Sequence, residues 1–285
     1  MLRILKRIYH KLGILLYRHD LDRDVVTLID SLGCKVNEKK HILRYLSVIK
    51  NKGAEFDVSN QRARLIFDGT TLCGPILDTS FLDVIVEFEK DEYELNIYDL
   101  KNKVVLDIGA NIGDSAVKFF KKGAKKVISL EPNKNLEQYF IQNMLLNGFK
   151  NYDYYSFGLS GKTETLSVPY RPWASAGTTT LNKLNWQHKN KWPEIKLDLL
   201  SFDIFTDKYL SNDQIDVIKL DCEGSEYDIL QNDAFFDLKP SLIFVEYHLG
   251  LQNLETILQE KGYRTSVKQK TDTVGLIFAE SLHYT

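Results

Sequence analysis

The chain has 285 residues, of which 44% are hydrophobic, and a formal net charge of −2. This length and hydrophobic content allow one large core, or one core with a small appendage. Acidic and basic residues are well mixed, which argues against a nucleic-acid-binding protein. The three cysteines, Cys34, Cys73 and Cys222, are far apart and indicate reduced thiols rather than a metal site. No apolar run approaches the ~20 residues of a membrane span, so a cytoplasmic location is expected.

Residues 1–18 combine basic and apolar side chains. Lysines and arginines interrupt the apolar residues and no small-residue cleavage site follows, which disfavours a signal peptide. The apolar residues recur at spacings of three and four, which predicts an amphipathic basic helix: Leu2, Leu5, Tyr9, Leu12 and Leu16. We favour a helix packed on its own domain. The alternative is a peripheral membrane contact or a partner contact through this segment.

Residues 1–100 are expected to form an N-terminal helical and small-β cap region that shapes an acceptor pocket. Helical patterns run over about 24–32, 40–50 and 81–95. Between them, residues 54–77 alternate with period two and contain turn signals at 59–60 and 68–69, which predicts short strands or a hairpin. The domain boundary is expected after residue 100, so the predicted domains are 1–100 and 101–285.

The most informative stretch is 103–131, KVVLDIGANIGDSAVKFFKKGAKKVISLE. An apolar strand, a glycine-bearing turn, a helical pattern and a second apolar strand follow one another. Gly109 and Gly113 allow a sharp turn close to a ligand, and the next helix points unpaired N–H groups at an anionic group. Glu131 ends the second strand, where a carboxylate can accept hydrogen bonds from both hydroxyls of a ribose. The pattern therefore predicts a nucleoside ligand with a negatively charged appendage.

The remaining chain alternates strand and helix, which predicts a mostly parallel sheet with helices on both faces. The last two strands are joined by residues 270–272 only, so they should pair antiparallel. Residues 159–170 are predicted to form a hairpin with its turn at Gly161-Lys162. A long polar segment with Trp173, Trp186 and Trp192 follows, typical of a lid or binding loop. Strands are expected near 104–109, 126–131, 152–157, 195–200, 215–221, 241–247, 263–269 and 273–279, and helices near 113–122, 134–147, 202–210, 224–233 and 251–261.

The turn DIGANIG does not fit a dinucleotide GxGxxG pattern, because Asn111 and Asp114 occupy two glycine positions. It resembles instead the DxGxxxG motif of class I S-adenosylmethionine-dependent methyltransferases. Together with GAKKVISLEPN, IDVIKLDCEGSEYDIL and LIFVEYH, it is specifically similar to the FkbM family. The resemblance implies an α/β fold of Rossmann-like type, with a mostly parallel seven-stranded sheet and one antiparallel strand. It also implies S-adenosyl-L-methionine as the cofactor and a hydroxyl of a sugar or secondary metabolite as the acceptor.

The cofactor is expected at the carboxyl ends of the strands. Asp107 should orient the glycine turn or contact the cofactor's ammonium, and Asn111 tolerates left-handed backbone angles. Asp114 or Ser115 is expected to cap the next helix. The resemblance places the adenine near Phe157 and Gly158. The cofactor-binding residues are expected to be Asp107, Gly109, Ala110, Asn111, Gly113, Glu131, Pro132, Phe157, Gly158 and Asp221.

Three residues are candidates for the base that takes the acceptor's proton, namely Asp221, Glu223 and His248. His248 suits neutral pH best, since an unperturbed histidine titrates near pH ~6.5. Asp221 and Glu223 are alternatively helix caps without chemistry. Lys219 points to the same sheet face as Asp221 and is its expected ion-pair partner.

Other functions are kept as alternatives. A metal-assisted methyltransferase would use Asp221, Glu223, Glu246 and His248 as Mg²⁺ ligands, although no metal ligand is predicted by spacing. A nicotinamide-dependent oxidoreductase is disfavoured by the broken GxGxxG pattern, and a catalytically silent adenosyl-binding protein by the intact glycine turn. The expected partner is a small-molecule or carbohydrate acceptor rather than nucleic acid. The oligomeric state is left open.

Overall fold

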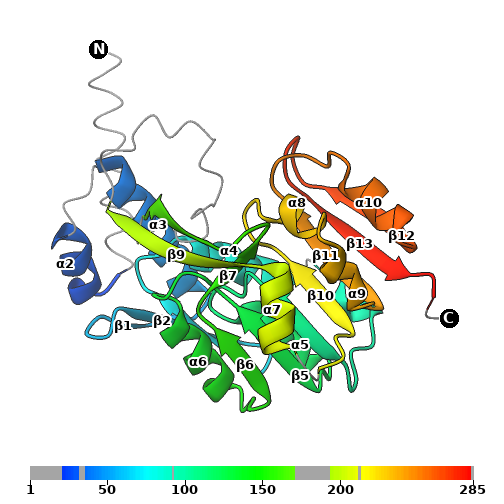
Figure 1. The fold of residues 1–285 in the computed structure, drawn as a ribbon. Coiled ribbons are helices and arrows are strands. Elements are labelled where there is room, and N and C mark those ends of the chain that lie inside the picture. Colours follow the sequence, from blue (N-terminus) through cyan, green and yellow to red (C-terminus); the bar gives the residue numbers. More distant parts are fainter. Residues whose placement is uncertain (1–20, 32–35, 92, 171–192, 211–212, 284–285) are drawn as a thin grey trace. The chain divides into compact units, whose positions relative to one another are not determined.

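The computed structural model describes residues 21–31, 36–91, 93–170, 193–210 and 213–283 (Figure 1). The predicted amphipathic helix over residues 1–18 and the three tryptophans lie outside these residues. Within them, the chain forms two compact units, one up to Glu89 and the other from Lys90 onward. No helix of the described part of the chain has both the length and the apolar composition to cross a membrane.

The first unit contains helices and a small antiparallel sheet, as the sequence predicts. Strands β1, β2 and β3 pair in sequential order, with turns at the two positions that the glycine and asparagine signals indicate. The bounds are α2 Arg23–Ser31, α3 Val36–Asn51, β1 Glu55–Asp57, β2 Arg62–Phe67, β3 Thr70–Pro75 and α4 Ser80–Lys90. Alternating burial along β2 explains the period of two in its sequence.

The second unit is built on a seven-stranded sheet of order β12-β13-β11-β10-β4-β5-β6. Its strands are β4 Val104–Ile108, β5 Lys126–Leu130, β6 Tyr152–Tyr155, β10 Val217–Leu220, β11 Leu242–Tyr247, β12 Tyr263–Gln269 and β13 Gly275–Ser281. Neighbours pair in parallel except for β13, which is antiparallel to both β11 and β12. In Figure 1 the pair β12–β13 forms one edge of this sheet and β6 the other. The expected mostly parallel sheet with one antiparallel strand is confirmed.

Helices cover both faces of this sheet. On one face, apolar residues of the neighbouring strands β13, β11, β10, β4 and β5 form a continuous core with α7 Phe202–Tyr209, α8 Glu226–Ile229, α9 Asp233–Asp237 and α10 Leu254–Glu260. The other face carries α5 Asp114–Lys121 and α6 Glu137–Leu146. There the fully buried Phe140 of α6 packs on the ring of Tyr154, with ring centroids 4.5 Å apart. Burial of these apolar rows supplies the main driving force for folding of this unit.

Strand alternation brings polar residues together on the α5–α6 face. Asp107 is the cross-strand neighbour of Lys219 on one side and of Ser129 on the other. Since side chains two residues apart share a face, Asp221 continues the row of Lys219 at the carboxyl end of β10. The sheet thus builds a polar line that runs toward the end of the strands where a ligand is expected.

Two sequence predictions for this unit are wrong. Residues 159–170 do not form a hairpin, because β9 Glu194–Ser201 lies between β7 Gly158–Ser160 and β8 Glu164–Pro169. Strand β9 pairs in parallel with β7 and antiparallel with β8. The helix predicted over 224–233 ends early, as the short helix α8, and a separate helix, α9, begins at Asp233. The side chain of Asn232 accepts a hydrogen bond from Ala234 N and so caps the start of α9.

Candidate active site

The glycine turn after β4 is held tightly against its neighbours. Gly109 N and Ala110 N both donate to Leu130 O, at 2.9 and 3.0 Å. Gly109, Asn111 and Gly113 have positive φ angles of 83°, 48° and 86°, so the predicted left-handed conformation of Asn111 is confirmed. Gly113 is the N-cap residue of α5 and has no side chain, so the first amides of this helix receive no hydrogen bond from a side chain at the cap position. The turn is therefore shaped for an anionic or polar ligand group.

Asp107 supports the turn from inside the protein. Its side chain is fully buried, accepts a hydrogen bond from Ser115 Oγ at 2.6 Å and pairs with Lys219 Nζ at 3.2 Å. Ser115 thus binds Asp107 instead of capping α5. Asp107 bonds to these two side chains rather than to the backbone of the turn, contrary to one of the two roles expected for it.

Lys219 is the buried cation at the centre of the site. Its Nζ donates to Gly109 O at 2.8 Å and lies 3.5 Å from Asp221 Oδ2, which confirms the predicted Lys219–Asp221 ion pair. Burial acts to lower the pKa of Lys219, but the charges of Asp107 and Asp221 outweigh it and raise the pKa well above its usual range. A permanently charged ammonium therefore links β4, β10 and the glycine turn.

Glu131 joins the end of β5 to the glycine turn. One carboxylate oxygen accepts from Asn111 N at 3.0 Å and the other from Asn133 N at 2.7 Å. The residue is 8% exposed, and burial raises its pKa to about 7, partly opposed by these two hydrogen bonds. Each carboxylate oxygen keeps a further lone pair, so Glu131 can still accept hydrogen bonds from a ligand's hydroxyls.

Pro132 and Gly158 pack against each other next to Glu131. A Cβ atom on Gly158 would lie 3.2 Å from Pro132 Cγ and 2.8 Å from a methyl carbon of Leu199, so a larger residue at this position would require the Leu199 side chain to move. Phe157 is half-buried, and its ring lies 5.5 Å from that of Tyr155 in a stacked arrangement. Pro132 and Gly158 are therefore in contact, whereas the ring of Phe157 packs with those of Tyr155, Phe205 and Tyr209.

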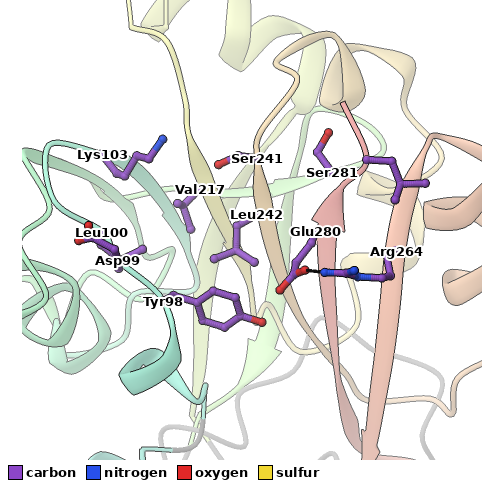
Figure 2. A pocket seen from close by; sticks show the side chains of 11 residues that line it. Tyr98, Asp99, Leu100, Lys103, Val217, Ser241, Leu242, Arg264, Glu280 and Ser281 are labelled. Carbon is purple, nitrogen blue, oxygen red and sulfur yellow. Dashed lines mark hydrogen bonds and ion pairs between the residues drawn. The ribbon is translucent and has the colours of Figure 1, made fainter. Parts of the chain in front are cut away.

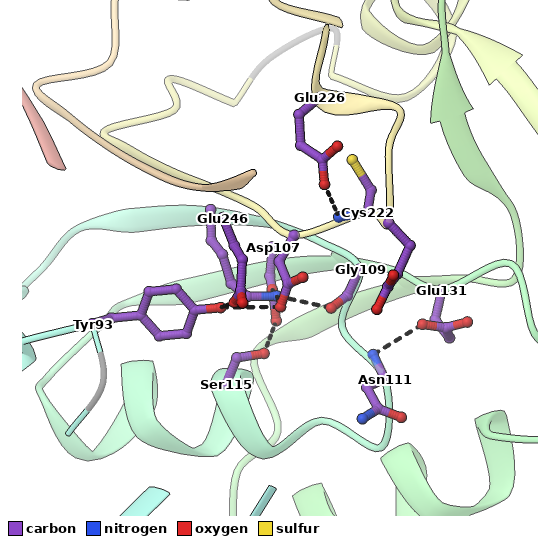
Figure 3. A network of polar contacts seen from close by, with 12 residues as sticks. Tyr93, Asp107, Gly109, Asn111, Ser115, Glu131, Cys222, Glu226 and Glu246 are labelled. Atoms are coloured by element: carbon purple, nitrogen blue, oxygen red, sulfur yellow. Dashed lines mark hydrogen bonds and ion pairs between the residues drawn. The ribbon is translucent and has the colours of Figure 1, made fainter. Parts of the chain in front are cut away.

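A group of acidic residues follows β10 and β11. Asp221 Oδ2 accepts from Tyr93 Oη at 3.0 Å, and the same hydroxyl lies 3.5 Å from Glu246 Oε2. Glu246 Oε1 in turn accepts from Lys270 Nζ at 2.7 Å. Figure 3 shows Tyr93, Glu246 and Asp107 converging near the glycine turn.

The ionisation of these acids differs from residue to residue. Burial opposes ionisation of Asp221, but the charges of Lys219 and His248 outweigh it and hold its pKa below the usual range. Burial raises the pKa of Glu223 to about 7, and burial with the nearby Asp221 charge raises that of Glu246 to about 7. Perturbed carboxyl groups of this kind are typical of functional sites.

His248 bridges this acidic group. Its Nδ1 lies 2.9 Å from Glu226 Oε1, and its Nε2 lies 3.7 Å from Asp221 Oδ1 and 3.9 Å from Glu223 Oε1. Burial acts to lower the pKa of His248, but the hydrogen bond to Glu226 and the three negative charges outweigh it and raise the pKa to about 10. A histidine in this state is protonated at neutral pH, whereas the sequence argument assumed an unperturbed one.

Tyr93 and Glu226 are site residues that the sequence analysis missed. Tyr93 lies in a loop far upstream of the sheet, and its ring packs edge-on against Phe244, with centroids 6.0 Å apart. Glu226 is fully buried, and the sequence placed it only within the helix expected near 224–233. The run DCEGSE places three acids within six residues, which is the one local signal that points to Glu226.

Two other features bear on the alternatives. The described residues include no group of three or more histidine, cysteine or acidic side chains placed to hold a metal ion.

A cavity of about 280 Å³ lies at the opposite, amino end of the strands, beside Val217 and Leu242 (Figure 2). Two of its charged side chains, Arg264 and Glu280, pair with each other. This cavity is not part of the acidic site.

The fold and the site define a Rossmann-like α/β protein of the class I methyltransferase type. The family model for the methyltransferase FkbM domain matches residues 107–265, which is more than half of the chain. The chain belongs to this family. Membership confirms the resemblance seen in the sequence, the methyltransferase class and S-adenosylmethionine as the cofactor that this class uses.

Several solved structures are similar to the chain. They include TYW2 of M. jannaschii in complex with AdoMet, at 13% identity and a TM-score of 0.46, covering 77% of this chain and 85% of that one. Precorrin-6y C5,15-methyltransferase of Geobacter metallireducens GS-15 has 16% identity and a TM-score of 0.39, covering 70% and 87%. Ribosomal protein L11 methylase of Lactobacillus delbrueckii subsp. bulgaricus has 14% identity and a TM-score of 0.38, covering 70% and 76%. A search of curated proteins found no significant match.

Proposed function

We propose that the protein is an S-adenosylmethionine-dependent O-methyltransferase whose acceptor is a hydroxyl of a sugar or secondary metabolite. The observation that carries this proposal is the junction of the glycine turn with the ends of β5 and β10. Asn111 N bonds to Glu131, and Gly109 O bonds to Lys219, so the three strand ends form one connected surface. The ribose would bind Glu131, and the adenine would lie along Pro132, Phe157 and Gly158.

The sulfonium methyl carbon is already electrophilic. The protein's task is therefore to position the acceptor oxygen in line with the methyl group, to exclude water and to accept the proton of the hydroxyl. Asp221, Glu223 and His248 were the candidates for the base. Asp221 is held ionised by the charges of Lys219 and His248, which makes it a weak base, and protonated His248 has no free lone pair.

Glu223 is therefore the base in our proposal. Its pKa of about 7 lies near neutral pH, where a general base combines ionisation with basicity most effectively. Its side chain is 35% exposed, so an acceptor can reach it. Asp221 and His248 would orient Glu223 and the acceptor, and Tyr93 would hold Asp221. We also propose a cytoplasmic location.

The cofactor site is tested by calorimetric titration with S-adenosylhomocysteine. Wild-type protein should bind it, and Glu131→Ala should lose about ten- to a hundredfold in affinity, since hydrogen bonds to a charged group are worth about 1.5–3 kcal/mol. Glu260→Ala, which removes an exposed carboxylate at the end of α10, is the matched control. Absence of binding to the wild type would overturn the proposal and favour another role for this fold.

The acceptor is tested by a screen of hydroxyl compounds, followed through release of S-adenosylhomocysteine. With an acceptor found, Glu223→Gln should lower kcat by about 10²- to 10⁴-fold, the usual contribution of a general base. The same substitution should leave the affinity for S-adenosylhomocysteine unchanged, because Glu223 is assigned to the acceptor and not to the cofactor. An unchanged kcat would remove Glu223 from this role.

A further inference from the structure

Glu226 has more partners than a helix-capping residue needs. It is the first residue of α8 and is fully buried. Its Oε1 accepts from Cys222 N at 3.1 Å and its Oε2 from Gly224 N at 2.7 Å. The same Oε1 lies 2.9 Å from Nδ1 of His248. A buried carboxylate with three partners is fixed in place, because losing any of them would leave a desolvated charge underbonded.

The turn that Glu226 closes has an unusual backbone. Glu223 has a φ of 53° and Gly224 a φ of 111°, both in the left-handed region. A glutamate rarely adopts this conformation unless the surrounding structure enforces it, and such residues cluster at active sites. The hydrogen bonds from Cys222 N and Gly224 N to Glu226 flank Glu223 on both sides. They hold its side chain toward His248, with Glu223 Oε1 3.9 Å from Nε2.

Glu226 also decides how the His248 ring is oriented. Because Nδ1 faces Glu226, Nε2 points to the opposite side, where Asp221 Oδ1 lies 3.7 Å away and Glu223 Oε1 3.9 Å away. A ring turned the other way would break the contact between Nδ1 and the buried carboxylate. The ring therefore connects Glu226, which no acceptor can reach, with two carboxylates that are partly exposed.

We propose that Glu226 is a positioning residue for methyl transfer. Its carboxylate holds His248 as a protonated cation with Nε2 facing Asp221 and Glu223, and so sets the pH range in which Glu223 accepts the acceptor's proton. This inference rests on the proposed function for the role of Glu223. The linkage between Glu226, His248 and Glu223 itself follows from the contacts alone.

The charged groups around His248 agree with this role. Negative charge comes from Asp221 and Glu223 in the turn, from Glu226 in α8 and from Glu246 at the end of β11. Lys219 pairs with Asp221, and Lys270 pairs with Glu246.

Two further titratable residues near His248 are Cys222 and Tyr227, and burial raises the pKa of both, which favours their neutral forms. Tyr93 donates its hydroxyl to Asp221. The net surroundings of His248 are therefore negative, and Glu226 is in direct hydrogen-bond contact with it.

The test measures two titrations directly by NMR and needs no acceptor. The His248 ring is followed through its carbon-bound protons, and Glu223 through its labelled side-chain carboxyl carbon. In Glu226→Gln the pKa of His248 should fall by more than about one unit, because the buried charge that stabilises the imidazolium is gone. In His248→Gln the pKa of Glu223 should rise, because the charge of His248 acts to lower it.

Controls keep the result independent of folding and of the proposed function. Asp233→Asn removes the carboxylate of an exposed ion pair with Lys261 and should leave both titrations unchanged. If Glu226→Gln does not fold, the Glu223 titration in His248→Gln still tests whether the charge of His248 lowers the pKa of Glu223. An unchanged His248 pKa in Glu226→Gln, or an unchanged Glu223 pKa in His248→Gln, would overturn the inference. Failure of the wild type to bind S-adenosylhomocysteine would instead overturn the proposed function and leave the linkage standing.

Discussion

Gly109 lies so close to Asp221 that a Cβ atom on Gly109 would be 1.7 Å from the Asp221 carbonyl oxygen. The glycine turn after β4 and the acidic turn after β10 are therefore in direct backbone contact. Since Asp221 N also donates to Ile108 O at 3.0 Å, the two turns are fixed relative to each other. Any displacement at Gly109 would move the carboxylates proposed to act on the acceptor.

Gly109→Ala should destabilise the protein strongly. The substitution combines the backbone contact with a φ of 83°, and we expect a loss of at least about 3 kcal/mol in the free energy of unfolding, measured with urea. Gly148→Ala is the matched control. Gly148 has a φ of 76° but no atom within 4 Å of the added Cβ, so the cost should be only about 1–2 kcal/mol. Equal losses in the two variants would contradict the close contact.

Lys219→Met should be similarly damaging, for an electrostatic reason. The substitution leaves the buried carboxylate of Asp107 without its cation. It also removes the positive charge that favours the ionised form of Asp221. Removing one partner of a buried ion pair costs about 3–5 kcal/mol. Lys103→Met breaks the more exposed pair with Asp216 and should cost about 0–1 kcal/mol. Urea unfolding of both variants at pH 7 checks the difference.

The pH dependence of stability should change in Glu223→Gln. In the folded protein burial raises the pKa of Glu223 to about 7, from a usual value of 4.5. Between these two pH values the folded state holds a proton that the unfolded chain has released, so the unfolding free energy of the wild type falls as pH rises. The glutamine variant has no carboxyl group at this position, so its unfolding free energy should not fall with pH for this reason.

The comparison for Glu223 is made by urea unfolding at several pH values. Going from pH 4 to pH 8, Glu223→Gln should gain about 1 kcal/mol relative to the wild type, after allowance for the partial exposure of the side chain. Asp203→Asn, a carboxyl substitution in the exposed first turn of α7, is the control and should show no such gain. If the unfolding free energies of the wild type and Glu223→Gln changed with pH in parallel, the pKa of Glu223 would not be raised in the folded protein.

Removal of divalent metal should leave cofactor binding unchanged. Of the four residues in the metal-assisted alternative, His248 directs Nδ1 to Glu226 and Glu246 bonds to Lys270. We expect the same affinity for S-adenosylhomocysteine after treatment with EDTA and after addition of Mg²⁺, by calorimetry. Methyl transfer, once an acceptor is known, should likewise be insensitive to EDTA. An activity lost with EDTA and restored by Mg²⁺ would revive the metal-assisted alternative.

Much of the fold was predictable because its signals are local. The apolar runs near 104–109 and 126–131, the left-handed backbone at Asn111 and the antiparallel last strand follow from residue spacing and conformational preference. The hairpin predicted over 159–170 failed for the opposite reason. Strand β9 comes from far along the chain and takes the place between β7 and β8, which no local pattern encodes.

By itself the sequence determined the glycine turn, the carboxylate that ends β5 and the acids that follow β10, since each of these depends on residue order within a short segment. Only the tertiary structure decided which of these acids is ionised. The buried charge of Lys219, the hydroxyl of Tyr93 and the contact of Glu226 with His248 come from strands and loops that are distant in sequence. Burial and neighbouring charges set a pKa, and both exist only once the chain has folded.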